Sequence, residues 1–234
     1  MDTIPASFGT AIALIGALDA KLLQIVLLSL QVSLSAVLFA SVIGLPLGAA
    51  IAVGRFPGRQ ALTVVLNGLM GLPSVVVGLL VYLLLSRAGP LGEFGLLFTP
   101  GAMVVAQTVL TAPLIAALSR QIVEDAWREL REQLRSLGAS TPRAAATLLW
   151  DARISLFTAI LAGFGRAAAE VGAVMIVGGN IDGVTRVMTT TIALETSKGD
   201  LPLALALGFI LVGLILAVNA VAYTTRQWAA RHYG

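Results

Sequence analysis

The segment Glu124–Arg153, EDAWRELREQLRSLGASTPRAAATLLWDAR, is a charged stretch that lies between two apolar ones. Its first half places apolar residues on one stripe at helical spacing, whereas charged residues cover the opposite face. The apolar stripe consists of Trp127, Leu130, Leu134 and Leu137, and the charged face of Arg128, Glu129, Arg131, Glu132 and Arg135. This pattern predicts an amphipathic helix.

Gly138 follows the last residue of the apolar stripe. Helices often end at glycine, because glycine adopts positive φ without strain. Ser140 or Thr141 then offers an N-cap, and Pro142 fits the first turn of a second helix. The segment is therefore predicted to form helix, glycine turn and helix at a membrane surface, where a soluble partner can bind it.

The rest of the chain is strongly apolar. Of its 234 residues, 58% are hydrophobic and 12% are charged, whereas soluble domains carry roughly 25% charged residues. The mean hydropathy is +0.94. These values predict an all-α polytopic membrane protein and argue against a soluble helical core, which needs more polar surface.

Few residues are suited to catalysis or metal binding. The chain has no cysteine, its single histidine is His232 in the C-terminal tail, and its only lysines are Lys21 and Lys198, so the GxxxxGK[ST] phosphate-binding loop is absent. The net charge of +3 comes from arginines near membrane edges rather than along one stripe, which argues against a nucleic-acid partner. We expect a non-catalytic subunit that binds no metal or cofactor itself.

Five apolar runs are long enough to cross a bilayer, which takes about 20 residues. They are Leu22–Val53, Ala61–Ser86, Gly101–Ile122, Ile154–Gly179 and Leu201–Tyr223. Pro46, Pro73 and Pro113 are predicted to break the helices that contain them. Between the fourth and fifth runs, Thr189–Thr196 predicts a short helix.

The N-terminal segment Ile4–Leu18 is apolar but shorter than a full span. It is predicted either to lie along the membrane interface or to be a poorly ordered terminus. The resulting boundaries are a terminal segment at 1–20, outside the membrane or in its interface, a transmembrane domain at 21–228 that includes the charged region 124–153, and a tail at 229–234.

Basic residues are distributed unequally between the two sides of a five-span arrangement. One side carries Arg55, Arg59, Arg120, Arg128, Arg131, Arg135, Arg143, Arg153, Arg226 and Arg231, and the other carries Lys21, Arg87, Arg186 and Lys198. Because cytoplasmic loops are enriched in lysine and arginine, the N-terminus is predicted to lie outside and the C-terminus in the cytoplasm. A sixth span at 4–18 would place the N-terminus inside.

The fourth run contains polar residues at membrane depth. Arg166 and Glu170 are four residues apart, and on one helix they would share a face. Such charges are costly in a membrane, so they are predicted either to pair and fix helix packing or to line a polar path. Gly178 and Gly179 precede Asn180 at the end of the run, where the backbone can bend.

At its charged block, the sequence resembles the inner-membrane permeases of ATP-binding-cassette (ABC) importers. Their signature is Glu-Ala-Ala, three residues, Gly, nine residues and Ile-x-Leu-Pro. Here Glu132, Gln133 and Leu134 precede Gly138 and Ala139 at the matching spacing, and Leu148 stands at the Ile position. The sequence departs from the signature at both alanines and at Trp150-Asp151, which replaces Leu-Pro.

The resemblance extends from Leu22 to Asn219 and is strongest to the tungstate branch of the molybdate, tungstate and sulfate group. The segments that carry it are Gly71–Gly78, Leu97–Pro100, Gly163–Arg166, Glu170–Gly172, Gly178–Asn180, Thr185–Thr189 and Leu194–Asp200. It implies the type I importer transmembrane domain, with about five membrane helices and a cytoplasmic coupling helix.

The resemblance also implies partners and a location. These are a homodimer of permeases in a bacterial or archaeal plasma membrane, two cytoplasmic ATPases that use ATP and Mg²⁺, and an external protein that binds an oxyanion. Tungstate is the first expectation for the oxyanion, and molybdate or sulfate is the alternative. An ATPase-independent channel or scaffold is a competing class, but it has no need of the helix–glycine–helix block.

The predicted orientation is testable with single cysteines, because the chain has none of its own. A cysteine at position 90 is expected to react with an impermeant maleimide from outside, and a cysteine at position 131 only from the cytoplasm. Labelling with the opposite sidedness would contradict the orientation.

Overall fold

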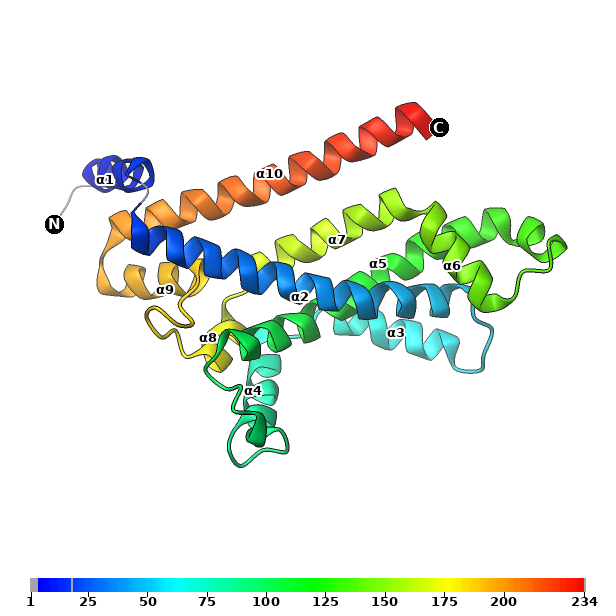
Figure 1. Cartoon of the computed structure of the whole chain (residues 1–234), viewed down its shortest axis with the longest axis horizontal. Coiled ribbons are helices and arrows are strands. Elements are labelled where there is room, and N and C mark those ends of the chain that lie inside the picture. Colours follow the sequence, from blue (N-terminus) through cyan, green and yellow to red (C-terminus); the bar gives the residue numbers. More distant parts are fainter. Residues whose placement is uncertain (1–3, 18, 234) are drawn as a thin grey trace. The chain divides into compact units, whose positions relative to one another are not determined.

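A computed structural model describes residues 4–17 and 19–233, and it is helical without strands over these residues (Figure 1). The elements in chain order are α1 (Ile4–Gly16), α2 (Ala20–Val53), α3 (Arg59–Leu69), α4 (Ser74–Leu85), the 3₁₀ turn η1 (Gly92–Phe94), α5 (Pro100–Ser136), α6 (Thr141–Asp151), α7 (Arg153–Ala168), α8 (Gly172–Gly178), α9 (Met188–Lys198) and α10 (Leu201–Tyr233).

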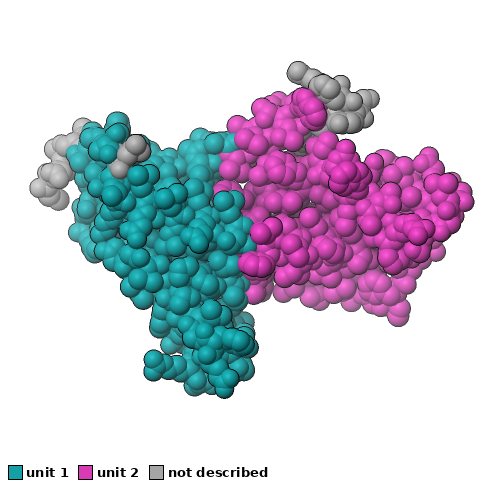
Figure 2. Space-filling view, in the orientation of Figure 1, with its two compact units in different colours: residues 1–35, 73–107, 168–217 teal, residues 36–72, 108–167, 218–234 magenta. Residues whose placement is uncertain are grey.

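The chain divides into two compact units, shown in different colours in Figure 2. Unit 1 consists of residues 1–35, 73–107 and 168–217, and unit 2 of residues 36–72, 108–167 and 218–234. Helices α2, α5 and α10 contribute residues to both units. Each unit is therefore described by itself.

Three helices are long and apolar enough to cross a membrane alone, namely α2, α5 and the 201–225 part of α10. Two further pairs pass the same test together but are bent, α3 with α4 by 98° and α6 with α7 by 76°. The described residues thus hold three to five candidate spans. Helix α1 is too short to be one, as its sequence predicts.

The helix boundaries correct two sequence predictions. The first half of the charged block does not form a separate surface helix, because α5 runs without a break from Pro100 to Ser136. The fourth apolar run is not a single helix either, since α7 ends at Ala168 and α8 begins at Gly172. At 16 residues, α7 is about 24 Å long, which is less than the hydrocarbon thickness.

The three prolines also behave differently from the prediction. Helices α2 and α5 continue through Pro46 and Pro113. Only Pro73 marks a helix boundary, where it precedes the first residue of α4. Of these three prolines, Pro73 alone therefore lies outside the helices, at the N-cap of α4 in the bend that separates α4 from α3.

In unit 1, α4 packs closely on α8. A Cβ atom built on Gly78 of α4 would lie 2.7 Å from the Cα atom of Ala173 in α8, so the two backbones meet there. A second core forms around Leu22, Ile25, Met188 and Leu207, and it joins the start of α2 to α9 and α10. Unit 1 thus holds its short helices by direct backbone approach and by close packing of apolar side chains.

In unit 2, α2 packs on α5 through glycine. A Cβ atom on Gly48 would lie 2.4 Å from the carbonyl oxygen of Ala116 and 2.7 Å from the Cβ atom of Ser119. Helix α7 also approaches α5 at Gly163, where a Cβ atom would lie 2.9 Å from the end of the Ile115 side chain rather than from the backbone. Small residues let helix backbones come close in membrane proteins, where burial of apolar surface gives little driving force.

Gly48→Ala is expected to destabilise unit 2, because the new methyl group overlaps the α5 backbone. Overpacking of this kind costs about 1–3 kcal/mol. The matched control is Gly68→Ala in α3, where an added Cβ atom meets nothing within 4 Å. The melting temperature of the purified protein is expected to fall for Gly48→Ala only. A fall of similar size in both variants would contradict the packing argument.

Candidate functional site

The turn between α5 and α6 has the geometry predicted from Gly138. Its φ is 69°, in the left-handed region. The Gly138 N–H donates to the Arg135 carbonyl at 2.9 Å, and the Ala139 N–H donates to the Leu134 carbonyl at 2.9 Å. This pair of bonds is the Schellman motif. It satisfies carbonyls at the end of α5, and the chain turns between Ser136 and Thr141, where α6 begins.

Apolar packing fixes this turn to the end of α2. Leu148 and Ala144 of α6 are buried with Ala49, Ala52, Val53 and Val123. Trp127, Leu130 and Leu134, three members of the predicted stripe, pack against this cluster. Leu134 and Leu148, both predicted to couple to an ATPase, therefore belong to the same apolar cluster, where Leu148 is buried and Leu134 is partly buried.

Two large apolar side chains are exposed in this region, Leu137 in the turn itself and Trp150 at the far end of α6. Leu137 is 81% exposed and Trp150 is 73% exposed. The sequence pattern assigned Leu137 to the packed stripe, and that assignment was wrong. The guanidinium of Arg153 lies 5.0 Å from the Trp150 ring and donates to the Trp150 carbonyl at 2.9 Å. Glu132, Gln133 and Gly138 are exposed as well, and Ala139 is half-buried.

The end of the fourth run differs from the predicted ion pair. Arg166 is exposed on α7, whereas Glu170 is 8% exposed and lies beyond the end of that helix. The two residues are therefore not one turn apart on a single helix. Instead, a Glu170 carboxylate oxygen accepts the Ala173 N–H at 3.1 Å, and the Glu170 carbonyl accepts the Thr189 hydroxyl at 2.8 Å.

Glu170 borders a small polar cavity within unit 1. The cavity has a volume of about 10 Å³ and is lined by Ser29, Val32, Ser33, Gln107, Ala168, Glu170, Val187 and Thr189. A space of this size holds at most one water molecule. The cavity is therefore no pathway in itself, and Glu170 serves first to hold the start of α8 against α9.

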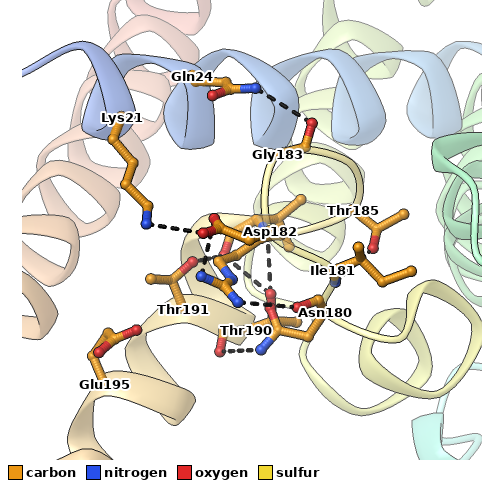
Figure 3. A network of polar contacts seen from close by, with 12 residues as sticks. Lys21, Gln24, Asn180, Ile181, Asp182, Gly183, Thr185, Thr190, Thr191 and Glu195 are labelled. Atoms are coloured by element: carbon orange, nitrogen blue, oxygen red, sulfur yellow. Dashed lines mark hydrogen bonds and ion pairs between the residues drawn. The ribbon is translucent and has the colours of Figure 1, made fainter.

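Gly178, Gly179 and Asn180 form a tight turn in unit 1. Gly179 and Asn180 have φ values of 71° and 50°, and the Thr185 hydroxyl donates to the Gly178 carbonyl at 2.6 Å. The Asn180 side-chain amide donates to the Thr190 carbonyl at 3.4 Å, which ties the turn to α9 (Figure 3). The backbone bend predicted after the two glycines is confirmed.

A charged network that the sequence did not predict lies on this turn. Asp182 forms ion pairs with Lys21 and Arg186, each at 3.0 Å (Figure 3). The hydrogen bond from Lys21 and the charge of Arg186 lower the pKa of Asp182. Because the folded pKa is lowered, this contribution to stability is present above the ordinary pKa and is lost as pH falls through the folded value.

The family model for the inner membrane component of binding-protein-dependent transport systems matches residues 44–232. The chain belongs to this family. The permease is similar to a probable anion ABC transporter permease protein of Haloferax volcanii, with 43% identity over 211 residues, which cover 88% of this chain and 91% of that relative.

Two further relatives belong to the group predicted from sequence. The permease is 40% identical over 227 residues to the tungstate uptake system permease protein TupB of Peptoclostridium acidaminophilum, covering 97% of this chain and 100% of that protein. It is 31% identical over 219 residues to the molybdenum transport system permease protein ModB of Escherichia coli, covering 89% and 93%. The predicted resemblance is confirmed.

The fold agrees with a solved transporter. A chain of the MetNI methionine ABC transporter, in inward facing conformations, matches with a TM-score of 0.69, covering 88% of the permease and 96% of that chain. At 22% identity, this match concerns the fold alone. The predicted fold class, the transmembrane domain of a type I ABC importer, is confirmed.

Glu170→Ala is expected to destabilise the permease, because it leaves the buried Ala173 N–H without its side-chain acceptor. An unsatisfied buried donor costs about 1–3 kcal/mol. Glu170→Gln retains an acceptor oxygen and is expected to cost less. The measurement is the melting temperature of each purified variant. Equal temperatures for Glu170→Ala and wild type would show that the carboxylate does not hold α8.

Proposed function

We propose that the permease forms the membrane pathway of a tungstate importer. The observation that carries this proposal is its 40% identity, over nearly its whole length, to a tungstate uptake permease. The similarity to a probable anion permease supports the same class of substrate. Molybdate is the second candidate, supported by the lower identity to ModB, and sulfate is the third through more distant relatives.

The proposed assembly contains two copies of the permease, two ATPase subunits on the cytoplasmic side and one external oxyanion-binding protein. Membership of a binding-protein-dependent family supports such partners and favours a transporter subunit over a self-sufficient channel or scaffold. The distribution of lysine and arginine supports an external N-terminus and a cytoplasmic C-terminus. ATP hydrolysis then occurs in the partner, and this subunit is not catalytic.

Coupling is proposed to occur at the turn around Gly138. Leu137 is an exposed apolar side chain in the turn and Trp150 is one at the far end of α6, so both are suited to contact a groove of the ATPase. Behind them, Leu148 is fully buried in the cluster that joins α6 to α2 and α5. A force on the exposed residues therefore acts on a rigid body rather than on a loose loop, and α6 leads through Ala152 into α7.

The same movement is proposed to reach the pathway. Arg166 is exposed near the end of α7, where a cation can face water and attract an oxyanion. Glu170 and the Gly178–Asn180 turn are proposed as the elements that position α8 and adjust when the importer changes state. Their bonds to Thr189, Thr185 and Thr190 support this positioning role.

The substrate is tested by uptake in cells that lack other importers of these oxyanions. Cells that express the permease with its ATPase and binding protein are expected to accumulate tungsten, and removal of the permease alone abolishes this. Excess molybdate or sulfate is expected to inhibit only weakly. Preferential accumulation of molybdenum or sulfur would overturn the tungstate assignment.

Gly138→Leu is expected to strain the left-handed turn by about 1–2 kcal/mol and to displace Leu137 and Trp150. We expect normal membrane insertion, reduced ATPase retention on purification and loss of uptake. Gly138→Asn is the matched control, because asparagine tolerates positive φ and an added Cβ atom meets nothing within 4 Å. If Gly138→Leu retains the ATPase and hydrolyses ATP at wild-type levels, the proposed coupling role is contradicted.

A further inference from the structure

A pocket lined by arginines lies in unit 2 where α2 ends. It has a volume of about 220 Å³, and its walls come from the end of α2, the following turn, the start of α3 and one face of α5. Its charged lining consists of Arg55, Arg59, Arg128, Arg131 and a single carboxylate, Glu124. The pocket is smaller than the roughly 300–1,000 Å³ typical of drug-sized ligands, so it suits a compact charged group.

Glu124 forms ion pairs with arginines of the pocket, but its single charge cannot neutralise all of them. Its carboxylate lies 3.3 Å from Arg59, 2.5 Å from Arg120 and 3.5 Å from Arg128, and Arg128 also pairs with the exposed Asp125 at 3.7 Å, so two negative charges are shared among three guanidinium groups. Arg59 also donates to the carbonyls of Ile51 and Ala52, at 2.7 and 3.1 Å, near the end of α2. These bonds hold the wall of the pocket in place before any ligand arrives.

Two arginines that line the pocket take no part in the ion pairs around Glu124. Arg55 and Arg131 form no ion pair with the described residues, and Arg131 is only partly exposed. An adjoining pocket of about 360 Å³ shares Trp127, Arg128 and Arg131 and adds Arg135 and Glu132. Guanidinium groups present paired N–H donors that match the oxygens of a phosphate. The surplus positive charge therefore points to an oxyanion ligand.

The location of the pocket favours a lipid as the source of that oxyanion. The apolar sequence of α2 ends at Gly54 and resumes at Ala61, so the turn between them lies where the chain leaves and re-enters the hydrocarbon. On α3, which starts at the pocket, Leu62, Val64 and Val65 are 40%, 66% and 55% exposed. Apolar surface for acyl chains thus continues from the arginines along one helix.

We propose that this pocket binds a phosphate-type oxyanion, supplied by the headgroup of an anionic phospholipid. Basic pockets at membrane edges are a known means of holding such headgroups. A free oxyanion in solution has the same chemistry and is the other source. The proposal concerns Arg55 and Arg131 and is independent of the transported substrate.

The test uses the assembled transporter in detergent and fluorescent phosphatidylglycerol as the probe, with phosphatidylcholine as the neutral comparison. The double variant Arg55→Gln/Arg131→Gln removes the two unpaired guanidinium groups and leaves the bonds of Arg59 and Glu124 in place. Each basic residue near a membrane contributes about 1 kcal/mol to anionic lipid binding, which is about fivefold in affinity at 25 °C. The double variant is therefore expected to bind phosphatidylglycerol about 25-fold more weakly.

The control is Arg87→Gln, which removes an exposed arginine on the loop after α4, outside the pocket. It is expected to bind phosphatidylglycerol like wild type, and all variants are expected to bind phosphatidylcholine equally. Equal melting temperatures in phosphatidylcholine would exclude misfolding of the double variant.

Inorganic phosphate distinguishes the two sources. Failure of phosphate to compete with phosphatidylglycerol assigns the pocket to the lipid headgroup, whereas competition that depends on Arg55 and Arg131 assigns it to a free oxyanion. Two results together would overturn the proposal: the double variant binds phosphatidylglycerol as tightly as wild type, and phosphate binding does not depend on the two arginines. So would loss of the ATPase from the double variant with unchanged lipid affinity, since the arginines would then contact protein.

Discussion

The unbroken backbone of α5 is the constraint on which unit 2 depends. Inside the unit, the carbonyl of Ala116 on α5 lies so close to Gly48 that no side chain fits between α5 and α2. Further along the same helix, Trp127, Leu130 and Leu134 pack on the cluster that contains Leu148 of α6. One helix therefore both sets the spacing of the apolar core and carries the turn at Gly138.

This arrangement supports the proposal that the turn couples the permease to an ATPase. The two bonds of the Schellman motif fix the end of α5, and burial of Leu148 fixes α6. Leu137 in the turn and Trp150 at the far end of α6 stay exposed. The region thus combines a packed base with apolar contact surface, which supports the coupling role proposed for it.

The sequence predicted those features that local chemistry determines. The end of α2 at Val53, the start of α10 at Leu201 and the positive φ of Gly138 follow from an arginine turn, a polar loop and a glycine. The continuation of α5 past Ile122 was missed because a change from apolar to charged residues does not end a helix. Nothing between Ile122 and Ser136 breaks the backbone hydrogen bonds.

Other features depend on residues far apart in the chain. No proline in the sequence marks the break after Ala168. The break coincides with the hydrogen bonds of Glu170 to Ala173 and Thr189. The ion pair of Lys21 with Asp182 joins residues 161 positions apart, which no periodicity reveals. Leu137 has the spacing of a buried residue, but the core behind the stripe ends before reaching it.

The most direct test of the central claim is a crosslink from the turn to the ATPase. Leu137→Cys carries the only cysteine of the chain and can be labelled with a photoactivatable benzophenone maleimide in the assembled transporter. The same label at Glu93→Cys, on the exposed 3₁₀ turn, is the control. The account predicts a crosslink to the ATPase from position 137 and none from position 93. A label at 137 that reaches only lipid or solvent would contradict it.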